Sequence, residues 1–145
     1  MEPGAQEKPL NHLALALISG ASFVARGSAL DKIHLKELIK KAVGHKGFSF
    51  IDVLQPCIVF HNVVPYFQKN IYKLDETRDN SNFGLALKKA LEWDYCFDRD
   101  KPVPIGVFYQ TAKPIFEDQL PSKKPFYQIE RRINKKEILE EFNSF

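Results

Sequence analysis

Two short hydrophobic patterns of different period open the chain. Apolar residues between positions 10 and 18 recur every three or four residues, as on one face of a helix, and Gly20 follows as a stop signal. Residues 22–25 are largely apolar, β-inclined and too few for a helix. We therefore expect a helix over 10–18, followed by a buried strand over 22–25.

The clearest helical pattern begins at Asp31 and ends at Gly44, residue types suited to cap a helix at its start and at its end. Its apolar positions line one face, while lysines and a glutamate line the other. Residues 48–54 then read as a second buried strand. The order strand, helix, strand over 22–54 predicts a βαβ unit, whose two parallel strands lie in one sheet with helices on both faces.

The second half of the chain is less regular. In chain order the pattern predicts a mixed helical segment over 63–74, a polar loop over 75–82, a helix over 83–91 capped by Ser81, a strand over 103–109, a linker over 119–126 and a charged helix over 129–142. Pro104 and Gly106 place the strand towards an edge of the sheet, because proline cannot donate a ladder hydrogen bond. The predicted fold class is α/β, an open sheet of parallel strands flanked by helices.

Composition narrows the class of protein without identifying it. The chain has 145 residues, of which 44% are hydrophobic and 12% aromatic, enough for the core of one domain. No apolar run approaches the ~18–20 residues that span a bilayer, and no signal-peptide pattern is evident. The net charge of +3 is too mild to indicate nucleic-acid binding, and two cysteines are too few for a disulfide scaffold. We expect a cytoplasmic protein without membrane or nucleic-acid partners.

Cys57 is the first candidate for chemistry. It follows the second predicted strand in the segment Gln55-Pro56-Cys57, and ligands gather at the carboxyl ends of strands in open α/β sheets. Pro56 would fix the direction of the thiol. A metal ligand or nucleophile and a small packing residue are both consistent with this position. The common phosphate-loop, dinucleotide and paired-cysteine motifs are absent from the sequence.

Two charged residues lie in the predicted strands. Asp52, in a strand that otherwise reads as buried, is expected to be paired or turned to an edge, with a general base as the alternative. Arg26, at the end of the first strand, either faces an anionic ligand or projects into solvent. Of these two interpretations we favour the second. His61 and Asn62 follow Cys57 closely, which is more typical of turn and cap chemistry than of a thiol protease.

The remaining candidates have structural interpretations. Three histidines are expected to be surface or capping residues: His12, His34 and His45. An aromatic segment predicts a packed turn, formed by Trp93, Tyr95 and Phe97 with Cys96 as a small packing residue. From residue 121 onward, six basic and four acidic residues give the tail a net charge of +2, which predicts a solvated arm or one that docks on a partner subunit.

Five blocks of the sequence resemble the β subunit of 2-oxoacid:ferredoxin oxidoreductases. They read NHLALAL at 11–17, GASFVAR at 20–26, HKGFSFIDVLQPC at 45–57, ALEWD at 90–94 and VPIGVFY at 103–109. The resemblance covers residues 3–120 in order. The variant that the sequence most resembles acts on 2-oxoglutarate or on a broader range of 2-oxoacids.

The resemblance implies a function and a site. Enzymes of this family decarboxylate a 2-oxoacid on thiamine diphosphate bound with Mg²⁺, pass electrons through a 4Fe–4S cluster to ferredoxin, and release an acyl-CoA. Their β subunit holds the diphosphate half of the thiamine site, and the α subunit supplies the other half. The family's fourth cluster ligand lies in the Pro-Cys that follows a strand. That position matches Cys57, so the resemblance implies that Cys57 is a metal ligand.

The sequence departs from the family pattern in two places. Residues 59–62 read VFHN where the family usually reads Thr-Phe-Asn. The sequence also begins just after the family's GDG…Asn segment, so the diphosphate and Mg²⁺ ligands and the three other cluster cysteines fall outside it.

We therefore expect the C-terminal half of such a β subunit, inactive by itself, which partners the N-terminal half, the α subunit, ferredoxin and coenzyme A. Residues 1–58 would complete the thiamine-diphosphate-binding domain, 59–120 would form a C-terminal extension domain, and 121–145 a charged tail. The alternative is a stand-alone interaction or structural protein that retains the fold without the chemistry.

Overall fold

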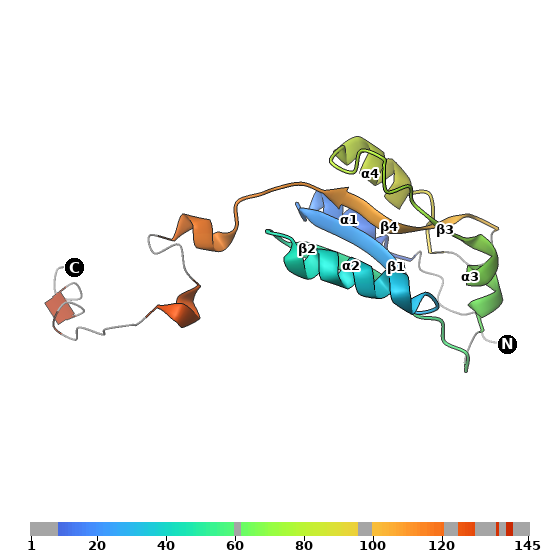
Figure 1. Cartoon of the computed structure of the whole chain (residues 1–145), viewed down its shortest axis with the longest axis horizontal. Helices are drawn as coiled ribbons and strands as arrows, with labels where there is room; N and C mark the ends of the chain where they lie inside the picture. The colour runs from blue at the N-terminus through green and yellow to red at the C-terminus, as the bar shows by residue number, and fades with distance from the viewer. Residues whose placement is uncertain are drawn as a thin grey trace. The chain divides into compact units, whose positions relative to one another are not determined.

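Figure 1 shows a computed structural model of the chain, in which residues 9–59, 62–95, 100–120, 125–129, 136 and 139–140 are described. The chain divides into two compact units, residues 1–113 and 114–145. The second unit contains two short 3-10 helices, η1 (Phe116–Gln119) and η2 (Phe126–Gln128). Most of the linker and the charged helix that the sequence predicts at this end of the chain fall outside the described residues.

The first unit contains the sheet and its helices. In chain order these are α1 (His12–Ile18), β1 (Phe23–Ser28), α2 (Lys32–Gly44), β2 (Ser49–Leu54), α3 (Val64–Asn70), β3 (Ile71–Lys73), α4 (Phe83–Ala90) and β4 (Val103–Gln110). The predicted α/β fold class is confirmed. The segment 63–74, expected to be mixed helical, is a helix that ends at Asn70 and a three-residue strand.

The four strands follow the order β2-β1-β4-β3. β1 and β2 are parallel, as the βαβ prediction requires, and β3 and β4 are parallel as well. The two pairs join through β1 and β4, which are antiparallel and carry a bulge at Val24/Ala25. The sheet is therefore built from two parallel pairs that run in opposite directions.

The structure corrects the predicted edge of the sheet. β4 lies between β1 and β3, and its Pro104 is tolerated there opposite Tyr72 of the short strand β3. The two end positions belong instead to β2 and β3, and among the described residues β2 pairs only with β1. The residues of β2 before Leu54 are half-buried or exposed rather than buried, because this strand has a neighbour on one side only.

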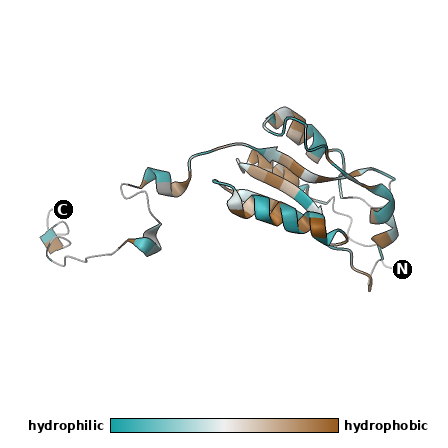
Figure 2. Ribbon diagram, in the orientation of Figure 1, coloured by the Kyte–Doolittle hydropathy of each residue, from teal (hydrophilic) through white to brown (hydrophobic). Residues whose placement is uncertain are grey.

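Helices cover both faces of the sheet. Successive strand residues point to opposite faces: Val24 packs in a cluster with residues of α1 and α4, whereas Phe23 and Ala25 pack against Leu38 of α2. A third cluster joins α3 to Trp93 and β4. Figure 2 accordingly shows the central strands largely in hydrophobic shades, while α2 alternates between hydrophobic and hydrophilic positions.

Side-chain caps fix where the helices begin. Asp31 accepts a hydrogen bond from the backbone N–H of His34 at 3.0 Å, which confirms it as the N-cap of α2. Asn82 plays this part for α4, where the sequence suggested Ser81. Ser81 is one residue too early, and its hydroxyl and N–H bond to Asp79 instead.

A tight turn connects α2 to β2 through Gly47. The Oγ atom of Ser22 lies 2.9 Å from Nε2 of His45 and also donates to the carbonyl of Phe48 at 3.2 Å. A serine hydroxyl carries one proton, so it accepts from the imidazole while donating to that carbonyl. Gly47 has a φ of +133°, and a Cβ placed there would lie 2.2 Å from Ser22 Oγ. The turn therefore requires glycine at this position.

No helix within the described residues combines the length and the apolar character needed to cross a bilayer.

We expect Gly47→Ala to lower the free energy of unfolding by about 1–3 kcal/mol, because it combines backbone strain with a clash against Ser22. Gly44→Ala is the matched control, since nothing lies within 4 Å of a Cβ added at Gly44. The control should leave stability unchanged or raise it by up to about 1 kcal/mol. Urea denaturation measures both, and equal effects would contradict this account of the turn.

Candidate functional site at the carboxyl ends of β1 and β2

The carboxyl ends of β1 and β2 lie side by side, and Cys57 follows them directly. In the parallel register Arg26 is opposite Asp52, and Ser28 is opposite Leu54. Cys57 lies three residues beyond Leu54 and is exposed, whereas Pro56 before it is buried. The buried packing role that the sequence left open therefore does not apply to Cys57.

Only part of the polar segment after Cys57 is described. His61 lies outside the described residues. The Oδ1 atom of Asn62 accepts a hydrogen bond from the N–H of Val64 at 3.1 Å, immediately before α3. This agrees with the expected turn chemistry, while the N-cap of α3, Val63, carries no side-chain cap hydrogen bond. Among the described residues, no group of three or more histidine, cysteine, aspartate or glutamate side chains comes together at metal-binding spacing.

Arg26 is buried, and the expectation that it projects into solvent is wrong. Its side chain has a relative exposure of 0%, and its Nε donates to Oδ2 of Asp52 at 2.9 Å. Its Nη1 points to the carbonyl of Pro104 at 3.5 Å. Asp52 is thus paired, the first of the two possibilities that its sequence position allowed. A guanidinium in the core requires such partners, because an unpaired buried charge is strongly unfavourable.

Aromatic rings enclose the guanidinium. Its Cζ lies 5.0 Å from the ring centroid of Trp93, 4.8 Å from that of Tyr95 and 5.5 Å from that of Phe108. These distances are those of cation–π contacts, which gain strength when water is excluded. The predicted packing of Trp93 and Tyr95 is confirmed in this sense, while Cys96 and Phe97 lie outside the described residues. The rings and the carboxylate of Asp52 together position the Arg26 guanidinium.

Tyr95 completes the cluster and is the functional residue that the sequence did not single out. Its hydroxyl accepts from Nη2 of Arg26 at 2.6 Å and donates to Oδ2 of Asp52 at 2.7 Å. Its φ of 61° is in the left-handed region, which is costly for a tyrosine and persists only when surrounding contacts enforce it. The ring of His12 packs edge-on against it at 5.1 Å. No short motif signals this role.

The arrangement holds strand ends together rather than moving a proton. One oxygen of Asp52 accepts from both Arg26 and Tyr95, which leaves little basis for the general-base alternative. Burial raises the pKa of the Tyr95 phenol to about 12; the positive charge of Arg26 opposes the shift, and the hydrogen bond to Asp52 reinforces it. Tyr95 therefore stays protonated at neutral pH and keeps both hydrogen bonds.

His34 and His45 lie away from this cluster. His45 bonds to Ser22 near the start of β1, and His34 lines a cavity beside α2.

We expect Arg26→Met and Asp52→Asn each to lower the free energy of unfolding by about 3–5 kcal/mol, because each breaks the pair while leaving its partner in place. The double variant should lose less than the sum of the two. Glu37→Gln with Lys40→Met is the control cycle, because that pair is exposed and should couple by no more than about 1 kcal/mol. Additive losses at Arg26 and Asp52, measured by urea denaturation, would contradict the model of a coupled buried pair.

The raised pKa of Tyr95 also makes stability depend on alkaline pH. The folded pKa of about 12 lies above the ordinary value of 10.0. The folded state therefore holds this proton more tightly than the unfolded state does, and stability is lost as pH rises from about 10 towards 12. Tyr95→Phe should remove this component of the pH dependence and the corresponding late step in the tyrosinate absorbance. A titration of Tyr95 indistinguishable from that of the unfolded chain would contradict the assignment.

Comparisons with known proteins agree with the resemblance seen in the sequence. Residues 57–124 match the model for the C-terminal part of the pyruvate ferredoxin oxidoreductase β subunit. The chain is 43% identical to the 2-oxoacid:ferredoxin oxidoreductase subunit β of a Sulfolobus species and 40% identical to that of Saccharolobus solfataricus, and each alignment covers 81% of this chain and 41% of the relative. The 2-oxoglutarate synthase subunit KorB of Methanocaldococcus jannaschii is 27% identical.

A solved structure has the same fold. It is a 2-oxoglutarate:ferredoxin oxidoreductase from Magnetococcus marinus with 2-oxoglutarate, coenzyme A and succinyl-CoA bound, and it matches with a TM-score of 0.76 and 26% identity. The match covers 94% of this chain and 46% of that one. The chain thus spans about two fifths of the length of the first two relatives. In both sequence and fold, the chain is similar over most of its own length to part of the β subunits of 2-oxoacid:ferredoxin oxidoreductases.

Proposed function

We propose that this chain forms part of the β subunit of a 2-oxoacid:ferredoxin oxidoreductase, an enzyme that oxidatively decarboxylates a 2-oxoacid to an acyl-CoA. The observation that carries the proposal is the 43% identity to the Sulfolobus β subunit, which extends over 81% of the chain. A 2-oxoglutarate synthase subunit among the relatives, and 2-oxoglutarate in the related structure, support a substrate of the 2-oxoacid class.

Cys57 is the residue proposed to meet a 4Fe–4S cluster. Its thiol is exposed at the carboxyl end of a parallel strand, where a group outside this chain can reach it. Thiolates are the usual ligands of such clusters, so the residue type fits. The other ligands would come from another polypeptide segment. A bound cluster would supply one-electron transfer, and ferredoxin, which the names of the relatives contain, would be the acceptor.

The residues of this chain hold the start of the Cys57 loop in a fixed position. Arg26 and Asp52 join β1 to β2 two residues before the strands end, so the loop that carries Cys57 leaves from a fixed point. Pro56 is buried directly before Cys57 and restricts the backbone there. Constrained ligands lose less conformational freedom on binding, which favours a stable site.

The proposal also names the partner subunits and the role of each part of this chain. We propose that an α subunit and the remaining part of the β subunit complete a thiamine diphosphate and Mg²⁺ site, and that coenzyme A and ferredoxin are the other reactants. In the same scheme, residues 1–58 belong to the thiamine-diphosphate-binding domain, 59–120 to an extension and 121–145 to a tail.

Reconstitution tests the proposal. The chain is combined with the rest of a β subunit and the α subunit, and the complex is assayed for 2-oxoacid-dependent reduction of ferredoxin and for the brown cluster chromophore. We expect Cys57→Ser to lose most of the chromophore and at least ~100-fold in ferredoxin reduction, since a lost ligand disrupts the cluster.

Cys96→Ser is the matched control, because it removes the other cysteine of the chain and should retain both signals. A full chromophore and full activity in Cys57→Ser would remove Cys57 from the cluster without affecting the family assignment. A stable complex that oxidises no 2-oxoacid would support the alternative of an interaction protein without the chemistry.

A further inference from the structure

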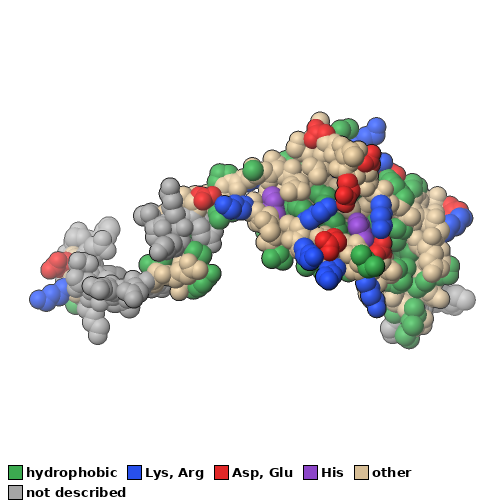
Figure 3. Space-filling model, in the orientation of Figure 1, with side chains coloured by type: hydrophobic (Ala, Val, Ile, Leu, Met, Phe, Trp, Pro, Cys, Tyr) green, Lys and Arg blue, Asp and Glu red, His purple; other side chains and the backbone are tan. Residues whose placement is uncertain are grey.

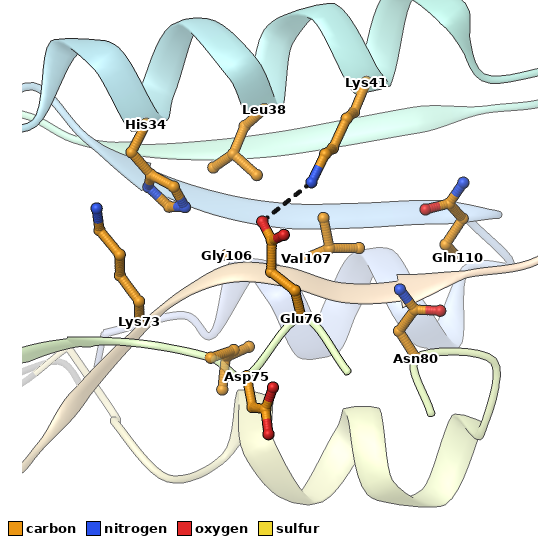
Figure 4. A pocket seen from close by; sticks show the side chains of 11 residues that line it. His34, Leu38, Lys41, Lys73, Asp75, Glu76, Asn80, Gly106, Val107 and Gln110 are labelled. Carbon is orange, nitrogen blue, oxygen red and sulfur yellow. Dashed lines mark hydrogen bonds and ion pairs between the residues drawn. The ribbon is translucent and has the colours of Figure 1, made fainter. Parts of the chain in front are cut away.

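A cavity of about 280 Å³ lies between α2 and the segment that connects β3 to α4. Figure 4 shows His34, Leu38 and Lys41 pointing into it from α2, with Lys73 and Glu76 reaching towards it from the opposite side. Its size is near the lower end of ligand pockets, which suits a small molecule. Cys57 is not among the residues that line it.

The spacing along α2 gives the cavity two polar ends and an apolar middle. His34, Leu38 and Lys41 follow the i, i+4, i+7 pattern of one helical face, so His34 and Lys41 leave the backbone of α2 two turns, or about 10 Å, apart along the axis. Leu38 lies between them and is 2% exposed. Leu74 and the backbone of Gly106, which has a φ of 126° and no side chain, extend the apolar floor.

Both polar ends carry groups suited to an anion. Lys73 stands near His34, and its Nζ lies 2.8 Å from Oδ2 of Asp31 in an ion pair that is partly exposed. Burial together with the charge of Lys73 lowers the pKa of His34. The imidazole is therefore neutral at physiological pH and able to donate one hydrogen bond. At the other end, Lys41 is accompanied by the side-chain amides of Asn80 and Gln110. Figure 3 shows basic, acidic and histidine side chains gathered on this face of the molecule.

Asp31 already occupies the anion's place at Lys73, and Glu76 occupies it at Lys41. Its carboxylate lies 3.2 Å from Nζ of Lys41, although its side chain is 81% exposed. An exposed pair of this kind contributes little stability, so a ligand carboxylate can displace it. The neighbouring Asp75 points away from the cavity, and its carboxylate accepts from the N–H and hydroxyl of Thr77. Glu76 is thus the acidic residue of the lining that competes for Lys41.

We propose that this cavity binds a short aliphatic dicarboxylate, with one carboxylate at Lys41 in place of Glu76 and the other at His34 and at Lys73 in place of Asp31. The apolar middle of the ligand would lie over Leu38. A dianion matches the two separated polar ends, whereas a monoanion satisfies one of them and an uncharged molecule neither.

Calorimetric titration of the full chain, together with any subunits that co-purify with it, tests this with glutarate as the probe. Butyrate and 1,5-pentanediol are the matched monoanion and uncharged probe. We expect saturable glutarate binding, at least ~10-fold weaker butyrate binding, and none for the diol, because each lost charge-assisted contact costs about a factor of ten or more. Equal affinity for glutarate and butyrate, or no glutarate binding, would overturn the proposal.

Two pairs of variants on α2 and its surroundings separate the site from general surface charge. Lys41→Met should weaken glutarate binding by at least ~10-fold, while Lys40→Met, which removes the adjacent exposed lysine, should change it less than about twofold. Glu76→Gln should tighten binding by about two- to fivefold because it removes the competing carboxylate, while Glu37→Gln should not. Equal effects within either pair would overturn the assignment of Lys41 and Glu76.

Discussion

The architecture of the first unit depends on one buried ion pair. Arg26 and Asp52 face each other across β1 and β2, and the guanidinium also reaches Tyr95 and the carbonyl of Pro104 in β4. A single charged group thus joins two parallel strands, an antiparallel neighbour and the segment after α4. Its removal would leave the Asp52 carboxylate, which is 12% exposed, without its charged partner, so the sheet depends on both members of the pair.

The sequence predicted helices and strands correctly where residues close together in the chain determine them. The helix that begins at Asp31 was predictable because its apolar residues recur with helical period and because Asp31 caps the N–H of His34, only three residues away. The parallel pair of strands on either side of this helix is confirmed as well. Cys57 was also marked as a candidate by its place after a strand. The position of β4 was mispredicted, since Pro104 indicated an edge while the strand lies inside the sheet.

Burial that depends on distant residues was not predictable in the same way. Arg26 looked like a strand-end residue in solvent, and the partner that changes this, Tyr95, lies 69 residues further along the chain. Nothing in the pattern around Tyr95 shows its positive φ, because that conformation is enforced by Arg26 and Asp52. The cavity beside α2 was not predictable from the sequence for a related reason. The lysines of α2 have the pattern of a solvated helix face, and only the folded chain places the segment from Lys73 to Asn80 opposite them.

Because β1 and β4 are antiparallel, β4 begins at the end of the sheet where β1 and β2 finish and where Cys57 follows. Arg26 pairs with Gly106 and Phe23 with Gln110, so the end at which β1 finishes is the end at which β4 begins. Residues 100–102, which lead into β4, therefore lie at the end of the sheet from which the loop of Cys57 leaves. In a sheet with all strands parallel, that segment would lie at the opposite end of the strands, away from the loop of Cys57. Chain direction thus allows insertions or exchanges between α4 and β4 to reshape the surroundings of the cysteine while the strand that precedes it stays unchanged.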